Sequence, residues 1–370
     1  MDITCSKFRD HSNPKLFDNR IFIINSEKTD RKKIAKALEI LHNKNVKVVG
    51  VDLLFDTLYN NQSDTLLQKS INARGNFIFA NTFSELKSGN ETSETLNSDP
   101  FLVPDSLQYY VNLATDDGFT VRTFEPYHVI NGQIKEAFSV ALARHLRPEV
   151  TDDIKKRKLK KEWINFRRYQ FGSQTQNTQS SKYSFPNYPI VGIDKFLMDS
   201  MLYTSSYFED KIVLIGFCGD GSDLSLKDRY FTPLNHKSSG RSFPDMHGVV
   251  IHANIISMLL DKDFINEVPG YRINIYTFLI FFLNYFIFNK VLQKKLFFNL
   301  PFIRVIQLIQ FIILFSVSIW LLANFNIKVS FVFLVTAVIL SYELFEFYNH
   351  KLQDKVVNLY SALKDKLTSF

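Results

Sequence analysis

The sequence predicts an α/β domain with a mixed sheet and flanking helices, followed by an all-α transmembrane bundle of three helices. Two observations lead to this fold class. Short apolar runs alternate with amphipathic stretches through residues 1–270, which is the pattern of strands connected by helices. Three long apolar runs then follow one another closely in residues 271–348. About 20 apolar residues are enough for a helix to cross a bilayer, so we divide the chain at these boundaries.

The first strands and helices follow from apolar periodicity. Residues 20–25 and 46–55 are apolar and predict strands, and residues 29–43 between them have the spacing of an amphipathic helix. A strand, a helix and a strand of these lengths form a βαβ unit, so we expect the two strands to pair in parallel. A second helix at 64–72 and a third strand at 76–82 extend this pattern.

The middle of the domain is more polar and contains turn signals. Residues 84–100, rich in Ser, Asn, Glu and Thr, predict a solvated loop. Residues 109–114 and 120–128 are β-prone and flank an Asp-Asp-Gly turn at Asp116, so we expect a hairpin there. Residues 134–146 have helical spacing and predict a helix.

The last part of the domain contains its most apolar segments. Residues 188–197 predict a short strand and a turn. Residues 211–217 (KIVLIGF) predict a strand at the centre of the sheet, and a Gly- and Asp-rich turn follows at 219–231. Residues 244–260 are apolar almost all round, so we expect a buried helix.

The net charge of +7 is concentrated in part in one basic run. Residues 155–168 contain eight Lys or Arg residues. Such a run is found in nucleic-acid and lipid-binding proteins, but a solvated helix face followed by a short strand at 163–166 explains it better, and a location outside the cytoplasm argues against nucleic acid. We favour the solvated face and expect no nucleic-acid partner.

Several acidic residues follow predicted strands and turns. Asp52 and Asp56 lie at the carboxyl end of the second strand, the edge where α/β sheets bind ligands. With Asp116, Asp117 and Asp228 they could hold a cation, but they lack a compact ligand spacing, so we favour a role in capping turns and helices. The candidate ligand-binding residues are Asp52, Asp56, Asp116, Asp228, Arg229 and His252.

The sequence supports no catalytic or metal constellation, and we expect no enzyme, no metal and no cofactor. His247 and His252 are five residues apart, whereas a spacing of four would align them on a helix face. The glycines at 216, 219 and 221 lack the order of a phosphate-binding loop. The two cysteines, Cys5 and Cys218, do not form a disulfide framework, and a single bridge between them is left open.

Three helices, at about 272–290, 303–324 and 328–348, are expected to cross the bilayer. The segment between the first two contains Lys290, Lys294, Lys295 and Arg304 and no acid, and basic residues in short loops stay in the cytoplasm. The large domain is therefore expected outside and the tail at 349–370 inside. At the cytoplasmic end of the bundle we expect Arg304 to pair with Glu343 or Glu346, because an unpaired carboxylate inside a membrane is costly.

The chain also resembles the type-2 CHASE domain, a sensory domain of bacterial receptors that is followed by three membrane spans. The resemblance is carried, in order, by VVGVDLLFD (Val48–Asp56), DDGFTVRTF (Asp116–Phe124), FSVALAR (Phe138–Arg144), KIVLIGF (Lys211–Phe217), LKDRYFTPL (Leu226–Leu234) and GVVIHANIISMLL (Gly248–Leu260). It implies an extracytoplasmic α/β sensor in the bacterial inner membrane that receives an unidentified stimulus and passes it inward.

Two departures from this family shape the expected function. Such receptors usually have a span before the sensor, whereas Met1–Asp10 is polar. We expect either that Met1 is a late start of a longer chain or that the first span translocates the N-terminus. Output domains often follow the spans, whereas the tail of this chain is a short amphipathic segment suited to a partner. We therefore expect a separate cytoplasmic signalling partner and leave a homodimer open. A structural or ligand-binding platform subunit of an envelope complex is the alternative, and an outer-side enzyme using the Asp residues is the least favoured.

Overall fold

The computed structural model describes most of the chain in two compact units, Met1–Phe264 and Ile265–Phe370. The described residues are 18–27, 29–72, 75–84, 94–96, 98–115, 120–130, 132–166, 188–219, 227–235, 243–293 and 299–347. Asp116, Asp117 and Gly118, the residue Cys5 and the tail at 349–370 lie outside these ranges.

A largely parallel sheet organises the first unit, with the strand order β11-β1-β12-β2-β3-β4 and β5 paired to β3. Its strands are β1 (Ile21–Asn25), β2 (Val48–Asp52), β3 (Phe77–Ser84), β4 (Glu94–Leu96), β5 (Gln108–Tyr110), β11 (Ile190–Gly192) and β12 (Ile212–Gly216). All five residues of β12 are buried, and the predicted central position of this strand is confirmed.

The expected direct pairing of the first two strands is wrong. The strands β1 and β2 run in the same direction, but they do not pair with each other. Instead β12 lies between them and pairs in parallel with each. The apolar β12 takes the position with a neighbour on both sides, where its buried backbone groups are all paired. Because β12 comes some 160 residues later in the chain, the spacing of the first βαβ unit gave no sign of the insertion.

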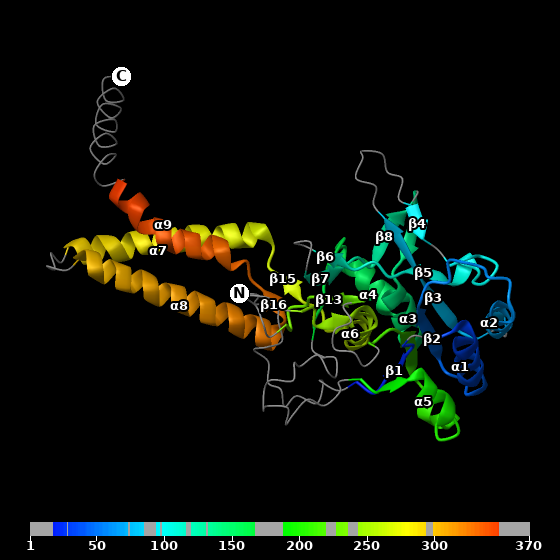
Figure 1. Cartoon of the computed structure of the whole chain (residues 1–370). Coiled ribbons are helices and arrows are strands. Elements are labelled where there is room, and N and C mark those ends of the chain that lie inside the picture. The colour runs from blue at the N-terminus through cyan, green and yellow to red at the C-terminus, as the bar shows by residue number, and fades with distance from the viewer. Residues whose placement is uncertain are drawn as a thin grey trace. The chain divides into compact units, whose positions relative to one another are not determined.

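Helices cover both faces of the sheet (Figure 1). One face packs against α1 (Arg31–Asn43), α2 (Gln62–Asn72) and α5 (Ile193–Met198), and the other against α3 (Phe138–Leu146) and α6 (Gly248–Asp261). Alternate strand residues point to opposite faces, so Ile21 and Ile23 join the α3–α6 core while Phe22 and Ile24 join the other core.

Short strands form the remainder of the first unit. They are β6 (Ala114–Thr115), β7 (Val121–Phe124), β8 (Tyr127–Ile130), β9 (Gln133–Glu136), β10 (Glu162–Trp163), β13 (Arg229–Tyr230) and β14 (Met246–His247). The hairpin expected around Asp116 is found only in part: β6 pairs antiparallel with β7, but Tyr109 and Tyr110 belong to β5 and extend the main sheet.

Four further expectations on element boundaries are corrected. The helix predicted from 134 begins at Phe138, because Gly132 adopts a φ of 75° and turns the chain into the β8–β9 hairpin. The predicted loop at 84–100 contains β4, which pairs with the end of β3. The turn predicted after β11 is the helix α5, and α6 begins at Gly248, four residues later than residue 244.

The helix α4 (Val150–Arg157) contains the start of the basic run. Lys155 and Lys156 are exposed on its last turn, and Arg157 forms an ion pair with the buried Glu162 at 2.8 Å. Lys161 of the same run lies 3.9 Å from Glu125. Where the run is described, it is therefore a largely solvated face in which Arg157 and Lys161 pair with acids of the same unit.

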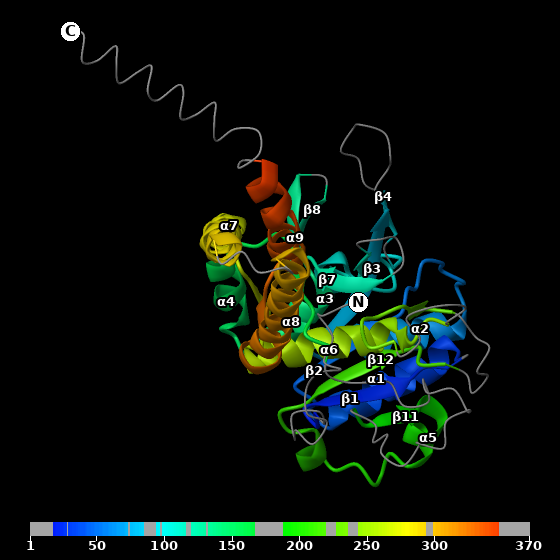
Figure 2. The same ribbon diagram turned by 90° about the vertical axis from the view of Figure 1, so that its left-hand side faces the viewer.

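Three apolar helices make up the second unit: α7 (Gly270–Gln293), α8 (Asn299–Phe325) and α9 (Phe331–Phe347). They lie side by side in both views (Figure 1, Figure 2). Two segments in the described part, Gly270–Val291 and Pro301–Phe325, are long and apolar enough to cross a membrane. The described length of α9 is 17 residues, which is short for a span, so the structure supports two candidate spans and not clearly three.

The pairing expected at one end of the bundle is confirmed. Arg304 at the start of α8 donates to Glu343 of α9 at 2.9 Å, and both side chains are about half exposed, at 50% and 46%. At the other end, the short strands β15 (Asn266–Glu267) and β16 (Ile327–Lys328) pair in parallel.

Candidate functional site

Three central strands end side by side at the carboxyl edge of the sheet. Asn25 of β1, Gly216 of β12 and Asp52 of β2 are in register with one another. Gly216 stands between the two polar residues, and a Cβ there would lie 2.9 Å from the Val249 side chain and 3.2 Å from the Cβ of Asp52. Glycine is therefore needed at this position, because a side chain here would collide with Val249 of α6 and crowd Asp52.

Asn25 holds the turn that follows β12. Its side-chain amide donates to the Gly219 carbonyl at 2.8 Å, and its side-chain oxygen accepts from the Cys218 amide at 2.8 Å. Gly219 has a φ of 99°, a backbone conformation that glycine adopts without strain. The turn is thereby fixed against the end of β1.

Asp228 reaches the same edge from the segment before β13. Its carbonyl accepts from the backbone amide of Gly248, the first residue of α6, at 3.1 Å. A Cβ on Gly248 would lie 3.0 Å from one carboxylate oxygen of Asp228, so this carboxylate sits against the helix N-terminus, where a negative charge is favoured. Tyr230 of β13 also forms a side-chain hydrogen bond to it.

Asp52 and Asp228 form an acidic pair at this edge. Burial raises the pKa of Asp52, and the negative charge of Asp228 raises it further. Burial also raises the pKa of Asp228. Two carboxyl groups that share one site resist double ionisation, so the pair can retain a proton where exposed aspartates have lost theirs. Chemically, it can exchange that proton for a cation.

Two neighbours of the acidic pair, Cys218 and Tyr230, remain uncharged. Burial raises the pKa of the Cys218 thiol, and the charges of Asp228 and Asp52 raise it further. Burial, with the same two carboxylates, raises the pKa of Tyr230 to about 12. Among the described residues, no group of three or more His, Cys, Asp or Glu side chains has a metal-binding arrangement. Of the described residues, Asp52 and Asp228 would supply the acidic ligands of a cation at this edge.

Arg229 lies beside the acidic pair on the β13–β14 ribbon. Its Nε donates to Nε2 of His247 at 3.3 Å. Burial and the positive charge of Arg229 lower the pKa of His247 to about 4, so the imidazole is neutral at physiological pH and accepts this hydrogen bond.

The other candidates from the sequence lie elsewhere. His252 is buried in α6, where its Nδ1 is 2.8 Å from the Ser139 hydroxyl and its ring packs on Phe138, so it belongs to the core. Asp56 is exposed and accepts from the neighbouring Thr57. The structure therefore brings together three of the six candidates and separates two, and Asp116 is outside the described residues.

Sequence reasoning missed several residues of this edge, among them Asn25, Cys218, Tyr230 and His247. Asn25 had a readable signal, because it ends the first strand as Asp52 ends the second and parallel strands end at one edge. Tyr230 and His247 come from short strands whose pairing no local pattern indicated.

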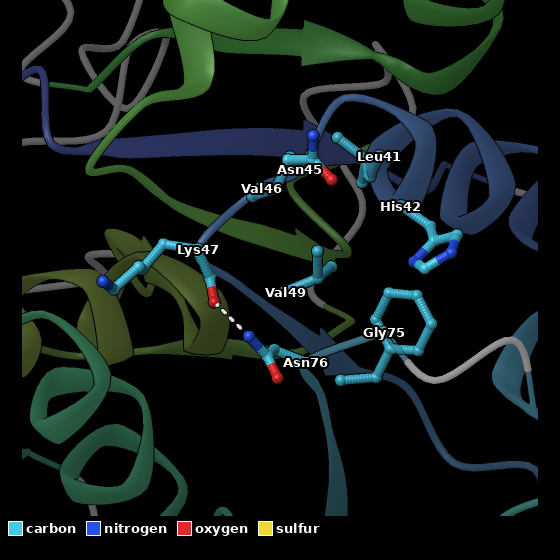
Figure 3. A pocket seen from close by; sticks show the side chains of 9 residues that line it. Leu41, His42, Asn45, Val46, Lys47, Val49, Gly75 and Asn76 are labelled. Carbon is cyan, nitrogen blue, oxygen red and sulfur yellow. Dashed lines mark hydrogen bonds between the residues drawn. The ribbon is translucent and has the colours of Figure 1, made fainter.

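A separate hollow of about 240 Å³ lies at the opposite, amino-terminal edge of β2 and β3 (Figure 3). Its lining includes His42 and Asn45 of the α1 end. The side-chain amide of Asn76 donates to the Lys47 carbonyl at 3.0 Å, and the Lys47 side chain extends away from the other labelled side chains. With its lysine turned outward and its amide engaged with the backbone, this hollow offers less ligand chemistry than the carboxyl edge.

Comparison with known proteins gives one match. The model of the CHASE2 domain family matches residues 18–288. No curated protein and no solved structure matches the chain. The matched region contains the α/β unit with its carboxyl-edge residues and continues into α7.

Proposed function

The chain belongs to the CHASE2 domain family, a family of extracellular sensory domains, and on that premise we propose that it is a membrane-anchored receptor acting through a separate output protein. One observation carries the proposal. The family match extends without a break from the α/β unit to residue 288, within the candidate membrane helix Gly270–Val291. A sensory domain joined so directly to an apolar helix has a covalent route for passing a movement to the membrane.

The proposed topology places the α/β unit outside the bacterial inner membrane and the C-terminus in the cytoplasm. In this arrangement α7, α8 and α9 all cross the bilayer. The basic residues Lys290, Lys294, Lys295 and Arg304 would then lie on the cytoplasmic side, as basic loop residues do. The described part of α9 supplies 17 residues, and the apolar Tyr348 continues the sequence.

The output partner is proposed to bind the tail at 349–370. Leu352, Val356, Leu359, Leu363 and Leu367 recur at spacings of three and four residues, and such spacing suits a helix that binds in a partner's groove. The chain would act by binding and not by catalysis, and neither nucleic acid nor a metal has a part in this scheme.

Deletion of the tail tests the receptor role against the platform alternative. We expect a strain whose chain ends at Tyr348 to show the same changes in protein phosphorylation or cyclic-nucleotide level as a strain without the gene. Membrane fractionation of the shortened chain provides the control for insertion. If the shortened chain behaves as the full chain does while the gene deletion has an effect, the outer unit alone is functional and the receptor proposal is wrong.

A further inference from the structure

A second cavity lies beyond the carboxyl ends of β3 and β5, at the same edge of the sheet as Asp52 but over different strands. Its volume is about 290 Å³, at the small end of the range for ligand pockets. The lining comes from β3, β5, β6, β8 and the segments next to β7 and β10: Phe83, Tyr110, Asn112, Leu113, Ala114, Thr115, Glu125, His128 and Lys161.

Three aromatic rings from three strands meet in this cavity. Phe83 and His128 stack with their ring centroids 4.4 Å apart and an interplanar angle of 17°. Tyr110 presents its edge to Phe83 at 5.6 Å, and its hydroxyl donates to the Glu125 carbonyl at 2.6 Å. Asn112 bonds both the amide and the carbonyl of Phe83, at 3.0 and 2.7 Å. The rings are thus held in place before any ligand arrives.

Among the described residues of the lining, Glu125 supplies a carboxylate. The Glu125 side chain is only 13% exposed, and its Oε2 is 2.5 Å from Nδ1 of His128. The other oxygen, Oε1, is 3.9 Å from the Lys161 ammonium, which is longer than the 2.7–2.9 Å or so of a charge-assisted hydrogen bond. The Lys161 side chain is 45% exposed, and such a loose pair contributes little to stability.

From this geometry we propose that the cavity binds a small organic ammonium, an amine with an apolar body, whose charged nitrogen replaces Lys161 at Glu125. Aromatic faces and a sheltered carboxylate both attract a positive charge. Lys161 already shows that an ammonium approaches this oxygen. An anion would meet the negative faces of the rings and Glu125, the acidic residue of the lining. That such an amine is the stimulus rests on the proposed receptor function, whereas its binding does not.

Three probes of nearly equal shape test the charge preference. Benzylamine, benzyl alcohol and benzoate are titrated by calorimetry into the detergent-solubilised full chain at pH 7. We expect benzylamine to bind roughly tenfold or more tightly than either of the others, since one lost ionic hydrogen bond corresponds to about this factor. Glu125→Gln is expected to weaken benzylamine binding by a similar factor, and Lys161→Ala to strengthen it a few-fold by removing the competing ammonium.

Glu209→Gln is the matched control, because Glu209 is an exposed acid outside the cavity, and it should leave binding unchanged. Preference for benzoate, loss of binding in Lys161→Ala, or no binding of benzylamine at millimolar concentration would each overturn the proposal. Should Glu125→Gln fail to fold, the probe series and the exposed Lys161→Ala still decide the matter. No signalling is measured, so failure of the receptor function leaves this test unaffected.

Discussion

The helices α6 and α8 are both strongly apolar, yet the apolar side chains of α6 are buried and many of those of α8 are exposed. In α6 every residue from Gly248 to Leu260 is buried. In α8 the large apolar side chains are about half exposed, among them Leu308, Ile309 and Ile312, while the polar Gln307 and Ser318 are 7% and 5% exposed. The protein itself covers α6, whereas α8 turns its apolar surface outward and its amides inward.

This contrast indicates what surrounds each helix in the folded protein. An apolar surface as extensive as that of α8 is stable only against lipid or another protein, and buried polar groups in such a helix must find partners within the bundle. The buried polar residues of α6 are satisfied as well, since Ser257 donates to Asp18 at 2.8 Å. What distinguishes the two regions is therefore the exposed apolar face and not the handling of polar groups.

A polar chain of hydrogen bonds joins the three helices of the bundle. Asn284 of α7 is fully buried and donates to Ser341 of α9 at 2.9 Å. Gln310 of α8 donates to Asn284 at 2.6 Å, and Gln307 donates to the Val338 carbonyl of α9 at 2.6 Å. One asparagine thus contacts both other helices, as polar side chains do in membrane bundles.

The largest expected effect separates the cores of the two regions. Ile251→Ala in α6 removes a fully buried side chain. We therefore expect it to lower the free energy of unfolding of the α/β unit by about 2–5 kcal/mol. Ile312→Ala in α8, whose side chain is 54% exposed, should cost less than about 1 kcal/mol in detergent. Denaturant unfolding followed by Trp163 fluorescence in a Trp320→Phe background measures the first, and Trp320 in a Trp163→Phe background the second. If Ile251→Ala and Ile312→Ala lower the free energy of unfolding equally, α6 and α8 do not differ in how they are buried.

The next effect concerns the polar chain. Asn284→Leu leaves Ser341 and Gln310 without their partner, and we expect it to destabilise the bundle by about 1–2 kcal/mol. Asn274→Leu makes the same change at an exposed position of α7 and should be nearly neutral. Unfolding in sodium dodecyl sulfate, followed by Trp320 fluorescence, compares the two. A neutral Asn284→Leu would mean that apolar packing alone holds the bundle together.

The carboxyl edge predicts a pH dependence for the α/β unit. Because the pKa of Asp52 is raised in the folded protein, the folded state binds more protons than the unfolded chain above the ordinary value of 3.8. Stability therefore falls as the pH rises from that value through the raised pKa. Asp52→Asn should flatten this fall and be more stable than the parent at pH 8, by about 1 kcal/mol or more.

Melting temperatures of the α/β unit between pH 4 and pH 9 check this expectation. Asp56→Asn is the control, because it removes one charge at an exposed position. A parent protein that gains stability over this range, or an Asp52→Asn variant less stable than the parent at pH 8, would contradict the burial of an acidic pair.

The smallest effect is expected from Arg304 and Glu343. Both are about half exposed, so their ion pair should contribute no more than about 1 kcal/mol. Arg304→Glu and Glu343→Arg are each expected to lower the resistance of the bundle to sodium dodecyl sulfate, and the double exchange to restore most of it. A double variant no better than the single ones would show that the two residues act separately.

The elements with strong local patterns could be predicted from the sequence. The helix from Arg31 has Asp30 as its cap, with a side-chain bond to the Lys33 amide at 2.9 Å, and the apolar run of β12 gave its central position. The insertion of β12 between β1 and β2 could not be predicted, because strand order depends on contacts far apart in sequence. The Asn-Gly sequence before β9 is a hairpin signal that could have been read, but the helical spacing downstream obscured it.

The candidate site divides in the same way. Asp52 could be found because a parallel strand ends there. Its partner Asp228 was included as one acid among several, and no spacing indicated that it meets Asp52. The cavity around Glu125 and His128 was not predicted, since its aromatic wall comes from three strands that only the fold brings together.

We propose that a bilayer covers the apolar surface of α7 and α8 and that the α/β unit lies outside. Single cysteines are introduced at Met201, Gln293 or Asn324 in a chain whose Cys5 and Cys218 are replaced by serine, and intact cells are treated with a membrane-impermeant maleimide. Met201, which is 91% exposed, and Asn324 at the end of α8 should be labelled in intact cells. Gln293 at the end of α7 should be labelled only after permeabilisation. Labelling of Gln293 but not of Met201 and Asn324 in intact cells, or equal labelling of all three, would show that this topology is wrong.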